Sequence, residues 1–454
     1  MTFSDSTEVA AQNQTAIVVG AGPTGTLMAL ILAQMNWKVS VYERRDSYSQ
    51  LNDNQNRRSY NIVLFSRGLR ALKQAGVTLP TEQSVVLKGN VRHSTKGAKK
   101  SPGFSEAVSV NRNILAQHLL KEGITRFPEH IKYYFNHRLE GINFEQKLAT
   151  FQIEEKQVSQ SFDLLVGADG VFSTVREIIV QQFDEFSADQ NHDQMTFKIC
   201  QLGKATNFTN STPDWEECFH TWPNTQPVTM LAPPNPDGTL TGVLILPQQS
   251  EITFDKIKTE NDINALFSAK FPDIFMGKPI PQDWVEDLLA QKVSLGGITT
   301  ICNHFHAGNS VVLVGDAAHS VWASLGQGCN VALESCRILA EILEAHNNNL
   351  PTALPAYTLA RKPDTDAIGR LSEQGFGGNK RAGNIVFFAK VITLSLFHKL
   401  LPKIFPKPAL LQLNQADVGY AEIETQWKAQ ERQLWGMAIG LIVIVLLIAG
   451  KVMV

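Results

Sequence analysis

Three short segments of this chain combine glycine with residues that can hold a phosphate or a sugar. Glycine lets backbone N–H groups approach an anion closely, and a carboxylate accepts hydrogen bonds from hydroxyl groups. Their order and spacing predict one shared site for a nucleotide-like ligand. The segments are Gly20-Ala21-Gly22-Pro23-Thr24-Gly25, Gly167-Ala168-Asp169-Gly170 and Gly315-Asp316-Ala317-Ala318-His319.

The first segment joins a strand to a helix. The apolar, β-branched run 15–19 predicts a buried parallel strand, and a helix opens at Pro23 and Thr24. Gly20 allows the tight turn, Gly22 lets the backbone approach a pyrophosphate, and Gly25 lets helix and strand pack closely. The alternative is a glycine turn in an unrelated βα unit.

A carboxylate follows the next predicted strand, residues 38–42. This residue is Glu43, at the distance where an acid accepts hydrogen bonds from a ribose. Together with the strand and the helix, it favours dinucleotide binding over an unrelated turn.

The second and third segments also follow apolar strands. Asp169 would lie near the ligand, although an Asp-Gly turn that caps the next helix is an equal alternative. Asp316 would accept hydrogen bonds from the ribityl hydroxyls of a flavin. Further on, a glycine-rich helix start offers N–H donors for the negative charge of a reduced flavin, and its residues are Gly326, Gln327, Gly328 and Asn330. FAD is therefore the predicted cofactor.

Length and composition narrow the class of protein. A chain of 454 residues should hold two domains, and a net charge of −2 predicts no nucleic-acid partner. The five cysteines form no CxxC pair, which argues against a structural zinc site or a disulfide framework and fits a reducing compartment. No metal site is expected.

The C-terminal residues 435–454 are almost entirely apolar, with Lys451 as the only charge. Twenty helical residues span about 30 Å, the thickness of the hydrocarbon core, and Trp435 stands where an interfacial anchor belongs. A buried core helix is the alternative. The pattern predicts a single-pass membrane anchor, and Lys428 and Arg432 predict a catalytic domain that faces the cytoplasm.

The predicted fold class is α/β: a Rossmann-like FAD-binding domain with an inserted antiparallel β-sheet substrate domain, a helical C-terminal region and a C-terminal transmembrane helix. Residues 1–14 are expected to be disordered. The FAD-binding domain comprises 15–76, 105–180 and 300–345, the substrate domain 77–104 and 181–299, the helical region 346–434 and the anchor 435–454.

In this order the three segments resemble the single-component FAD-dependent aromatic hydroxylases, the group A flavoprotein monooxygenases. The resemblance covers most of the chain and is strongest to the kynurenine 3-monooxygenase family. Further matching motifs are Arg58-Ser59-Tyr60-Asn61-Ile62, His93-Ser94, Val110-Asn111-Arg112, Phe135-Asn136-His137-Arg138-Leu139, Thr221-Trp222-Pro223 and Arg361-Lys362-Pro363-Asp364.

The resemblance implies that NAD(P)H, as a transient co-substrate, reduces FAD. The reduced flavin then adds O₂ at C4a, and the hydroperoxide passes an oxygen atom to an electron-rich aromatic ring. It also implies that Arg45 and Arg112 meet the FAD phosphates or ribose, and that the glycine-rich helix start lines the isoalloxazine. No side chain is assigned an acid–base catalytic role.

The substrate half departs from the family pattern. Where the family has an arginine for the substrate carboxylate, this chain has Asn90, and Arg92 is the nearest candidate. Phe104 replaces the family's tyrosine, and Leu325 ends a segment that is Pro-Phe-Phe in the family. We therefore expect a small aromatic substrate other than kynurenine, with Arg92, Phe104 and Leu325 at its site.

Two alternatives remain open at this stage. One is an epoxidase, hydroxylase or reductase of a membrane lipid or quinone precursor on the same scaffold. The other is a non-catalytic flavoprotein sensor in a membrane complex. Consumption of NAD(P)H with candidate substrates distinguishes these alternatives, because a sensor would show no turnover.

Overall fold

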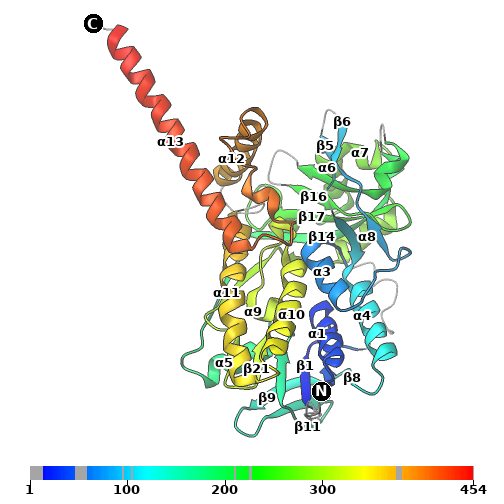
Figure 1. Cartoon of the computed structure of the whole chain (residues 1–454). Coiled ribbons are helices and arrows are strands. Elements are labelled where there is room, and N and C mark those ends of the chain that lie inside the picture. The colour runs from blue at the N-terminus through cyan, green and yellow to red at the C-terminus, as the bar shows by residue number, and fades with distance from the viewer. Residues whose placement is uncertain are drawn as a thin grey trace, which may run out of the picture.

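The computed structural model describes residues 14–46, 59–94, 97–103, 106–208, 211–223, 228–374 and 381–452; within these ranges the side chains of 223, 381–385, 388 and 441–452 are not described. Of the N-terminal residues expected to be disordered, all but Gln14 lie outside this description. Figure 1 shows the elements and their labels.

A six-stranded sheet gathers strands from distant parts of the sequence, in the order β20-β21-β12-β1-β2-β8. The strands β8, β2, β1, β12 and β21 pair in parallel, and β20 pairs antiparallel with β21. Apolar β-branched residues fill the central strands, as a sheet covered on both faces requires. The strands are β1 (Thr15–Val19), β2 (Lys38–Tyr42), β8 (Ile131–Tyr134), β12 (Leu164–Gly167), β20 (His306–Ala307) and β21 (Val311–Leu313).

Helices cover this sheet (Figure 1). The helix α1 (Pro23–Gln34) contacts β1 and lies against both α4 (Arg112–Arg126) and α10 (Gly328–Ala345). Nearly all of α1 is buried, which agrees with its lack of a polar stripe. Two further helices are α5 (Thr174–Gln182) and α9 (Asp316–His319), and a three-stranded sheet is formed by β9 (Arg138–Asn143), β10 (Leu148–Ile153) and β11 (Lys156–Ser161).

A second, seven-stranded sheet has the order β18-β14-β17-β16-β15-β5-β6. One face of this sheet packs against three helices and forms a second apolar core. The other face carries residues of intermediate exposure. Its strands and helices are β5 (Gly89–Ser94), β6 (Gly97–Pro102), β14 (Met195–Lys204), β15 (Cys218–Pro223), β16 (Thr229–Ala232), β17 (Thr239–Pro247), β18 (Ser294–Leu295), α6 (Glu260–Lys270), α7 (Pro272–Phe275) and α8 (Gln282–Ala290).

The described residues also form two smaller sheets. One is the three-stranded sheet β3-β7-β4, in which β3 precedes α3 in the sequence and β4 and β7 follow it. The other is the two-stranded sheet of β13 and β19. These elements are β3 (Asn61–Phe65), α3 (Ser66–Gln74), β4 (Ser84–Val86), β7 (Ala107–Asn111), β13 (Ala188–His192) and β19 (Ile298–Cys302).

The C-terminal part is helical: α11 (Leu350–Gln374), α12 (Arg381–Leu400) and α13 (Tyr420–Val452). The start of α13 packs against α11, with Tyr420, Ile423 and Trp427 buried, and the rest of the helix extends away from the body (Figure 1). The α/β fold is thus confirmed.

The structure corrects the prediction of a C-terminal transmembrane anchor. Residues 435–452 form the far half of α13, a helix whose first turns carry charge and pack on the folded domain, and not a separate span. Within the described residues, which leave out the side chains from Leu441 onward, no helix is long and apolar enough to cross a membrane. The predictions of a membrane partner and of a single-pass, cytoplasm-facing location are wrong on this finding.

A buried chain of polar groups stabilises the seven-stranded sheet. His93 Nδ1 lies 2.5 Å from Asp273 Oδ2, and His93 Nε2 lies 2.9 Å from His220 Nδ1. His220 Nε2–H donates to the Trp215 carbonyl at 2.9 Å, so a neutral His220 must accept at Nδ1. His93 Nε2–H therefore donates to His220, while the other ring nitrogen faces the Asp273 carboxylate and the ring stacks on Trp222 with 3.9 Å between the ring centroids.

We expect the stability of the protein to fall as pH falls below about 6.5. Burial lowers the pKa of His220 to about 3, and burial likewise lowers the pKa of His319 to about 3. Between pH 3 and 6.5 His220 and His319 bind a proton in the unfolded chain but stay neutral in the folded protein. Each histidine should then remove about 1.4 kcal/mol of stability per pH unit.

Urea unfolding at pH 7 and pH 5 tests this expectation. His220→Gln should lower the dependence of unfolding free energy on pH, whereas His192→Gln, at an exposed position, should leave it unchanged. Equal pH dependence in wild type and His220→Gln would show that His220 is not the proton-linked group.

Candidate flavin site

The first glycine turn has the geometry that close phosphate approach requires. Gly20 has φ +101°, and a Cβ there would lie 2.5 Å from the Ala168 carbonyl oxygen. A Cβ on Gly25 would lie 1.9 Å from the Gly20 oxygen, whereas one on Gly22 would meet no atom within 4 Å. Open space therefore lies above Gly22, at the uncapped N-terminus of α1, where the dipole and free N–H groups favour an anion. Pro23 is buried at the helix start, and Thr24 keeps part of its surface.

The three predicted segments converge in space. The Gly20–Ala168 contact joins the first to the second. Arg176 Nη1, just after the second, donates to the Ala317 carbonyl of the third at 2.8 Å. A Cβ on Gly315 would lie 2.8 Å from Thr24 Cγ2, which brings the third segment against the first.

Glu43 lies at the end of β2 beside the first turn. Its Oε2 accepts from the Ala21 N–H at 2.9 Å, and its Oε1 accepts from Arg45 Nε at 2.8 Å. Burial acts to raise the pKa of Glu43, but the hydrogen bond and charge of Arg45 outweigh it and hold the pKa below its usual value. Glu43 is thus an ionised acceptor, and its ribose contact stays a prediction.

Asp169 serves the local helix. Its Oδ2 accepts from the Val175 N–H at 3.1 Å at the start of α5, where Ser173 also caps the helix. Its Oδ1 is buried without a hydrogen-bond partner in the described part of the chain. Burial raises the pKa of Asp169, and the hydrogen bonds from Ser173 and Val175 oppose that effect.

Asp316 has a different environment. No described residue donates a hydrogen bond to its carboxylate, although the group keeps some accessible surface. Burial raises the pKa of Asp316, and the charge of Arg112 lowers it. A deep carboxylate that is accessible but unpartnered within the described residues, opposite an arginine, fits the hydroxyl and phosphate groups of FAD.

Tyr60 and Cys329 are neighbours that sequence reasoning did not assign. Burial raises the pKa of Tyr60, which also senses the charges of Arg112 and Asp316. Burial raises the pKa of Cys329 to about 12, with Asp316 the next cause. Both side chains keep intermediate exposure, and both interact electrostatically with Asp316 and Arg112. Tyr60 lies in a motif that carried the resemblance, but no local pattern indicates its contacts.

In the glycine-rich turn before α10 the backbone N–H groups remain available to a ligand, whereas the Asn330 side chain bonds to a neighbouring strand. Gly326 has φ +65°, and α10 begins at Gly328 without a side-chain cap, which leaves N–H donors for a ligand. The Asn330 amide instead ties α10 to β3, accepting from Phe65 N at 2.7 Å and donating to Val63 O at 3.0 Å.

Of the residues predicted for the substrate, Arg92 and Leu325 lie on different elements of the fold. Arg92 is exposed on β5, next to Thr221 of β15 and Lys99 of β6. Leu325 packs against the apolar cluster of the C-terminal helices. Phe104 lies outside the described residues.

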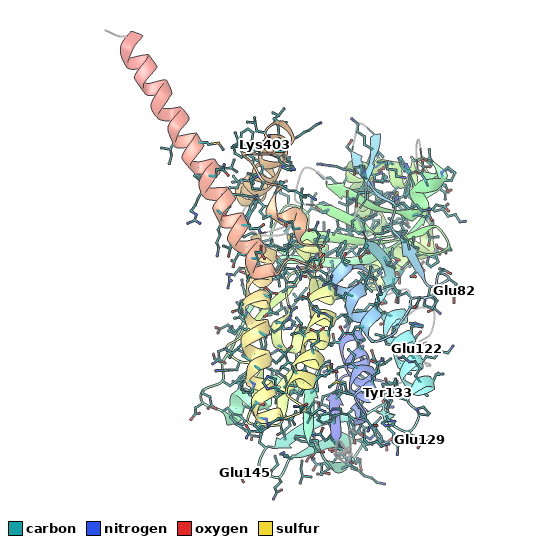
Figure 2. All side chains as sticks on the ribbon, in the orientation of Figure 1. Glu82, Glu122, Glu129, Tyr133, Glu145 and Lys403 are labelled. Carbon is teal, nitrogen blue, oxygen red and sulfur yellow. The ribbon has the colours of Figure 1, made fainter. Side chains whose placement is uncertain are left out.

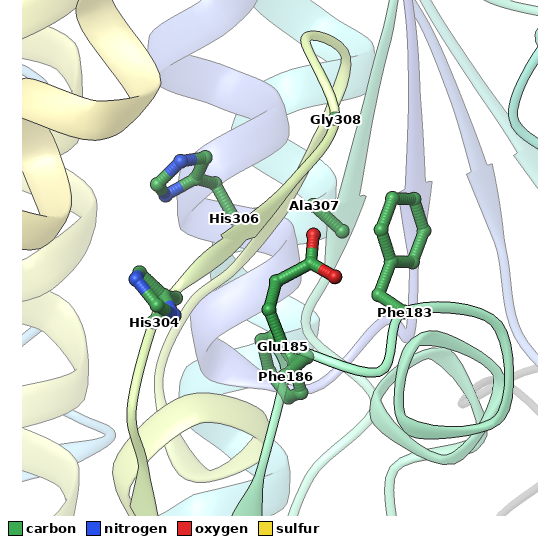
Figure 3. A pocket seen from close by; sticks show the side chains of 7 residues that line it. All are labelled: Phe183, Glu185, Phe186, His304, His306, Ala307 and Gly308. Atoms are coloured by element: carbon green, nitrogen blue, oxygen red, sulfur yellow. The ribbon is translucent and has the colours of Figure 1, made fainter.

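Figure 3 shows a pocket away from the three glycine segments. It lies around β20, before β21 begins, whereas Asp316 follows β21. His304 and His306 line it with Glu185, and their rings are 5.8 Å apart. The described residues contain no group of three or more His, Cys, Asp or Glu that could hold a metal ion.

A parallel sheet with a glycine turn after β1, an acid after β2 and a deep carboxylate after β21 is the arrangement expected of a dinucleotide-binding flavoprotein. A family model described as the FAD binding domain matches residues 13–370, and the chain belongs to that family. FAD is its cofactor, and the chain is an FAD-dependent monooxygenase.

Relatives and solved structures agree with this assignment. A kynurenine 3-monooxygenase of Salinispora tropica is 30% identical over 443 residues, which cover 95% of each chain. The pig (Sus scrofa) kynurenine 3-monooxygenase is 29% identical over 439 residues, 94% of this chain and 89% of that protein. The tetrameric form of 2-methyl-3-hydroxypyridine-5-carboxylic acid oxygenase shares the fold with a TM-score of 0.66 at 21% identity, covering 90% of this chain and 97% of that chain.

Proposed function

We propose that this monooxygenase hydroxylates an electron-rich aromatic small molecule other than kynurenine, with NAD(P)H as electron donor and O₂ as oxidant. When bound, FAD supplies the electron transfer and the oxygen activation. The chain's own residues bind and orient FAD, offer an apolar surface to the ring and exclude water.

The observation that carries the proposal is an apolar cluster beside the flavin turn. A Cβ on Gly326 would lie 3.8 Å from Phe65 Cε2, and Phe65 is buried with Leu87 and Ala107. Val63 and Phe219 pack on this cluster while keeping intermediate exposure. Such a surface suits a planar apolar ring.

The polar groups near this cluster argue against a carboxylate clamp. Asn90 pairs in register with Phe219, so an uncharged amide stands at the position that the resemblance gives to an arginine. Arg92 is two residues further along the same face of β5, about 7 Å away, and is exposed. A carboxylate buried beside Asn90 would meet an uncharged amide in place of a charged partner, which costs several kcal/mol.

NAD(P)H oxidation with product analysis tests the proposal. We expect simple anilines, phenols or indoles to stimulate oxidation and to be hydroxylated, and kynurenine to bind more weakly by orders of magnitude. Efficient, coupled formation of 3-hydroxykynurenine would contradict the proposal and make Arg92 the carboxylate partner.

Asn90→Arg provides a matched gain-of-function variant. A guanidinium beside Phe219 should lower the KM for kynurenine and leave the KM for an uncharged ring unchanged. Asn90→Gln, which adds length without charge, is the control. No difference between the two variants would contradict the role given to position 90.

A further inference from the structure

The side chain of Gln327, in the middle of the glycine-rich turn, is held from outside the turn. It is 1% exposed. Its Nε2 donates to Asn414 Oδ1 at 2.9 Å and to Leu325 O at 3.3 Å, and its Oε1 accepts from the Tyr420 hydroxyl at 2.9 Å. Two of the three partners belong to a C-terminal segment 87 and 93 residues further along the chain.

Tyr420 is itself fixed by a buried charge cluster. The Arg67 guanidinium carbon lies 3.8 Å above the centroid of the Tyr420 ring. Arg67 Nη1 is 2.9 Å from Glu334 Oε1, and Arg361 Nη2 is 2.9 Å from Glu334 Oε2. Arg67 also donates to the carbonyls of Leu413 and Val418.

This charge cluster joins α3, α10, α11 and the segment 413–420 into one unit. Tyr420 connects that unit to the flavin turn through its single hydroxyl. Gly326 has a left-handed backbone conformation, and glycine has more backbone freedom than any other residue. The hydrogen bonds of the Gln327 side chain therefore restrain a turn whose backbone could otherwise adopt other conformations. If the hydroxyl were absent, the buried Gln327 Oε1 would lose its donor, and the turn could rearrange.

We propose that Tyr420 is a positioning residue for the flavin. By donating to Gln327 it holds the backbone N–H groups at the start of α10 in the orientation that favours the more negative, reduced form of the isoalloxazine. The inference depends on FAD binding and not on the substrate proposed above.

Tyr420→Phe tests this role, because it removes only the hydroxyl and keeps the ring beneath Arg67. The readouts are the two-electron midpoint potential of the bound FAD, the FAD dissociation constant and the thermal midpoint. We expect a roughly tenfold loss of preference for reduced over oxidised flavin, which is a shift of about −30 mV. Tyr357→Phe is the matched control, since Tyr357 is also fully buried and its hydroxyl has no hydrogen-bond partner in the described part of the chain.

An unchanged potential in well-folded Tyr420→Phe would overturn the proposal. If that variant fails to fold, Asn414→Leu decides, because it removes the other C-terminal contact of Gln327 at a partly exposed position. Asn414→Leu should lower the potential in the same direction, and a wild-type potential there would reject the role. The substrate assay can fail independently, because neither readout needs substrate.

Discussion

Replacing Glu334 by glutamine should lower the free energy of unfolding by about 3–5 kcal/mol, because it removes the charge that two buried guanidinium groups share and leaves Arg361 only the more distant Asp364, at 3.6 Å. Arg67 is 2% exposed and Arg361 is fully buried, and both lie 2.9 Å from this one carboxylate. Burial acts to raise the pKa of Glu334, but the charges of Arg361 and Arg67 outweigh it and hold the pKa below its usual value.

Chemical denaturation at neutral pH measures this loss. The matched control is Glu341→Gln on the same helix, whose partner Arg337 lies 2.7 Å away but whose own side chain is 44% exposed. An exposed pair contributes about 1 kcal/mol at most. Similar losses in both variants would show that the cluster is not a buried ionic centre.

Figure 2 illustrates the more usual location of charged side chains, with Glu82, Glu129 and Glu145 at the periphery of the molecule.

Asp316→Ala should raise the dissociation constant of FAD by about ten- to a hundredfold. The carboxylate has no donor among the described residues, so its hydrogen bonds are free for the cofactor, and such a charged bond is worth about 1.5–3 kcal/mol. Fluorescence titration of apoprotein with FAD measures the change.

Asp169→Ala is the matched control for that variant. Its carboxylate is already used by the Val175 N–H at the start of α5, so its loss should reduce stability more than FAD affinity. Equal FAD affinity in wild type and Asp316→Ala would contradict the assignment of Asp316, whatever the control shows.

The strand, turn and helix around the first glycine segment could be predicted because their causes are local. Residues 15–19 form β1 and Pro23 begins α1, as the apolar run and the glycine spacing indicate. The contacts of Asn330 and Gln327 could not be predicted. Their partners lie 265 and 93 residues away, at Phe65 and Tyr420, and no short-range pattern encodes such pairs.

The C-terminal prediction failed for a related reason. A hydropathy pattern considers residues 435–454 alone, whereas the helix that contains residues 435–452 begins at Tyr420, with charged turns packed on α11. The substrate residues show the same limit. Nearness in sequence favours Arg92, yet strand register places Asn90, and not Arg92, beside Phe219.

The central claim is that the three glycine segments together bind FAD. The most direct measurement is the absorbance spectrum of the purified chain, followed by identification of the flavin released on denaturation. We predict flavin bands, an equimolar amount of FAD and no covalently attached flavin. A chain that shows no flavin bands, even after reconstitution with FAD, would contradict the account.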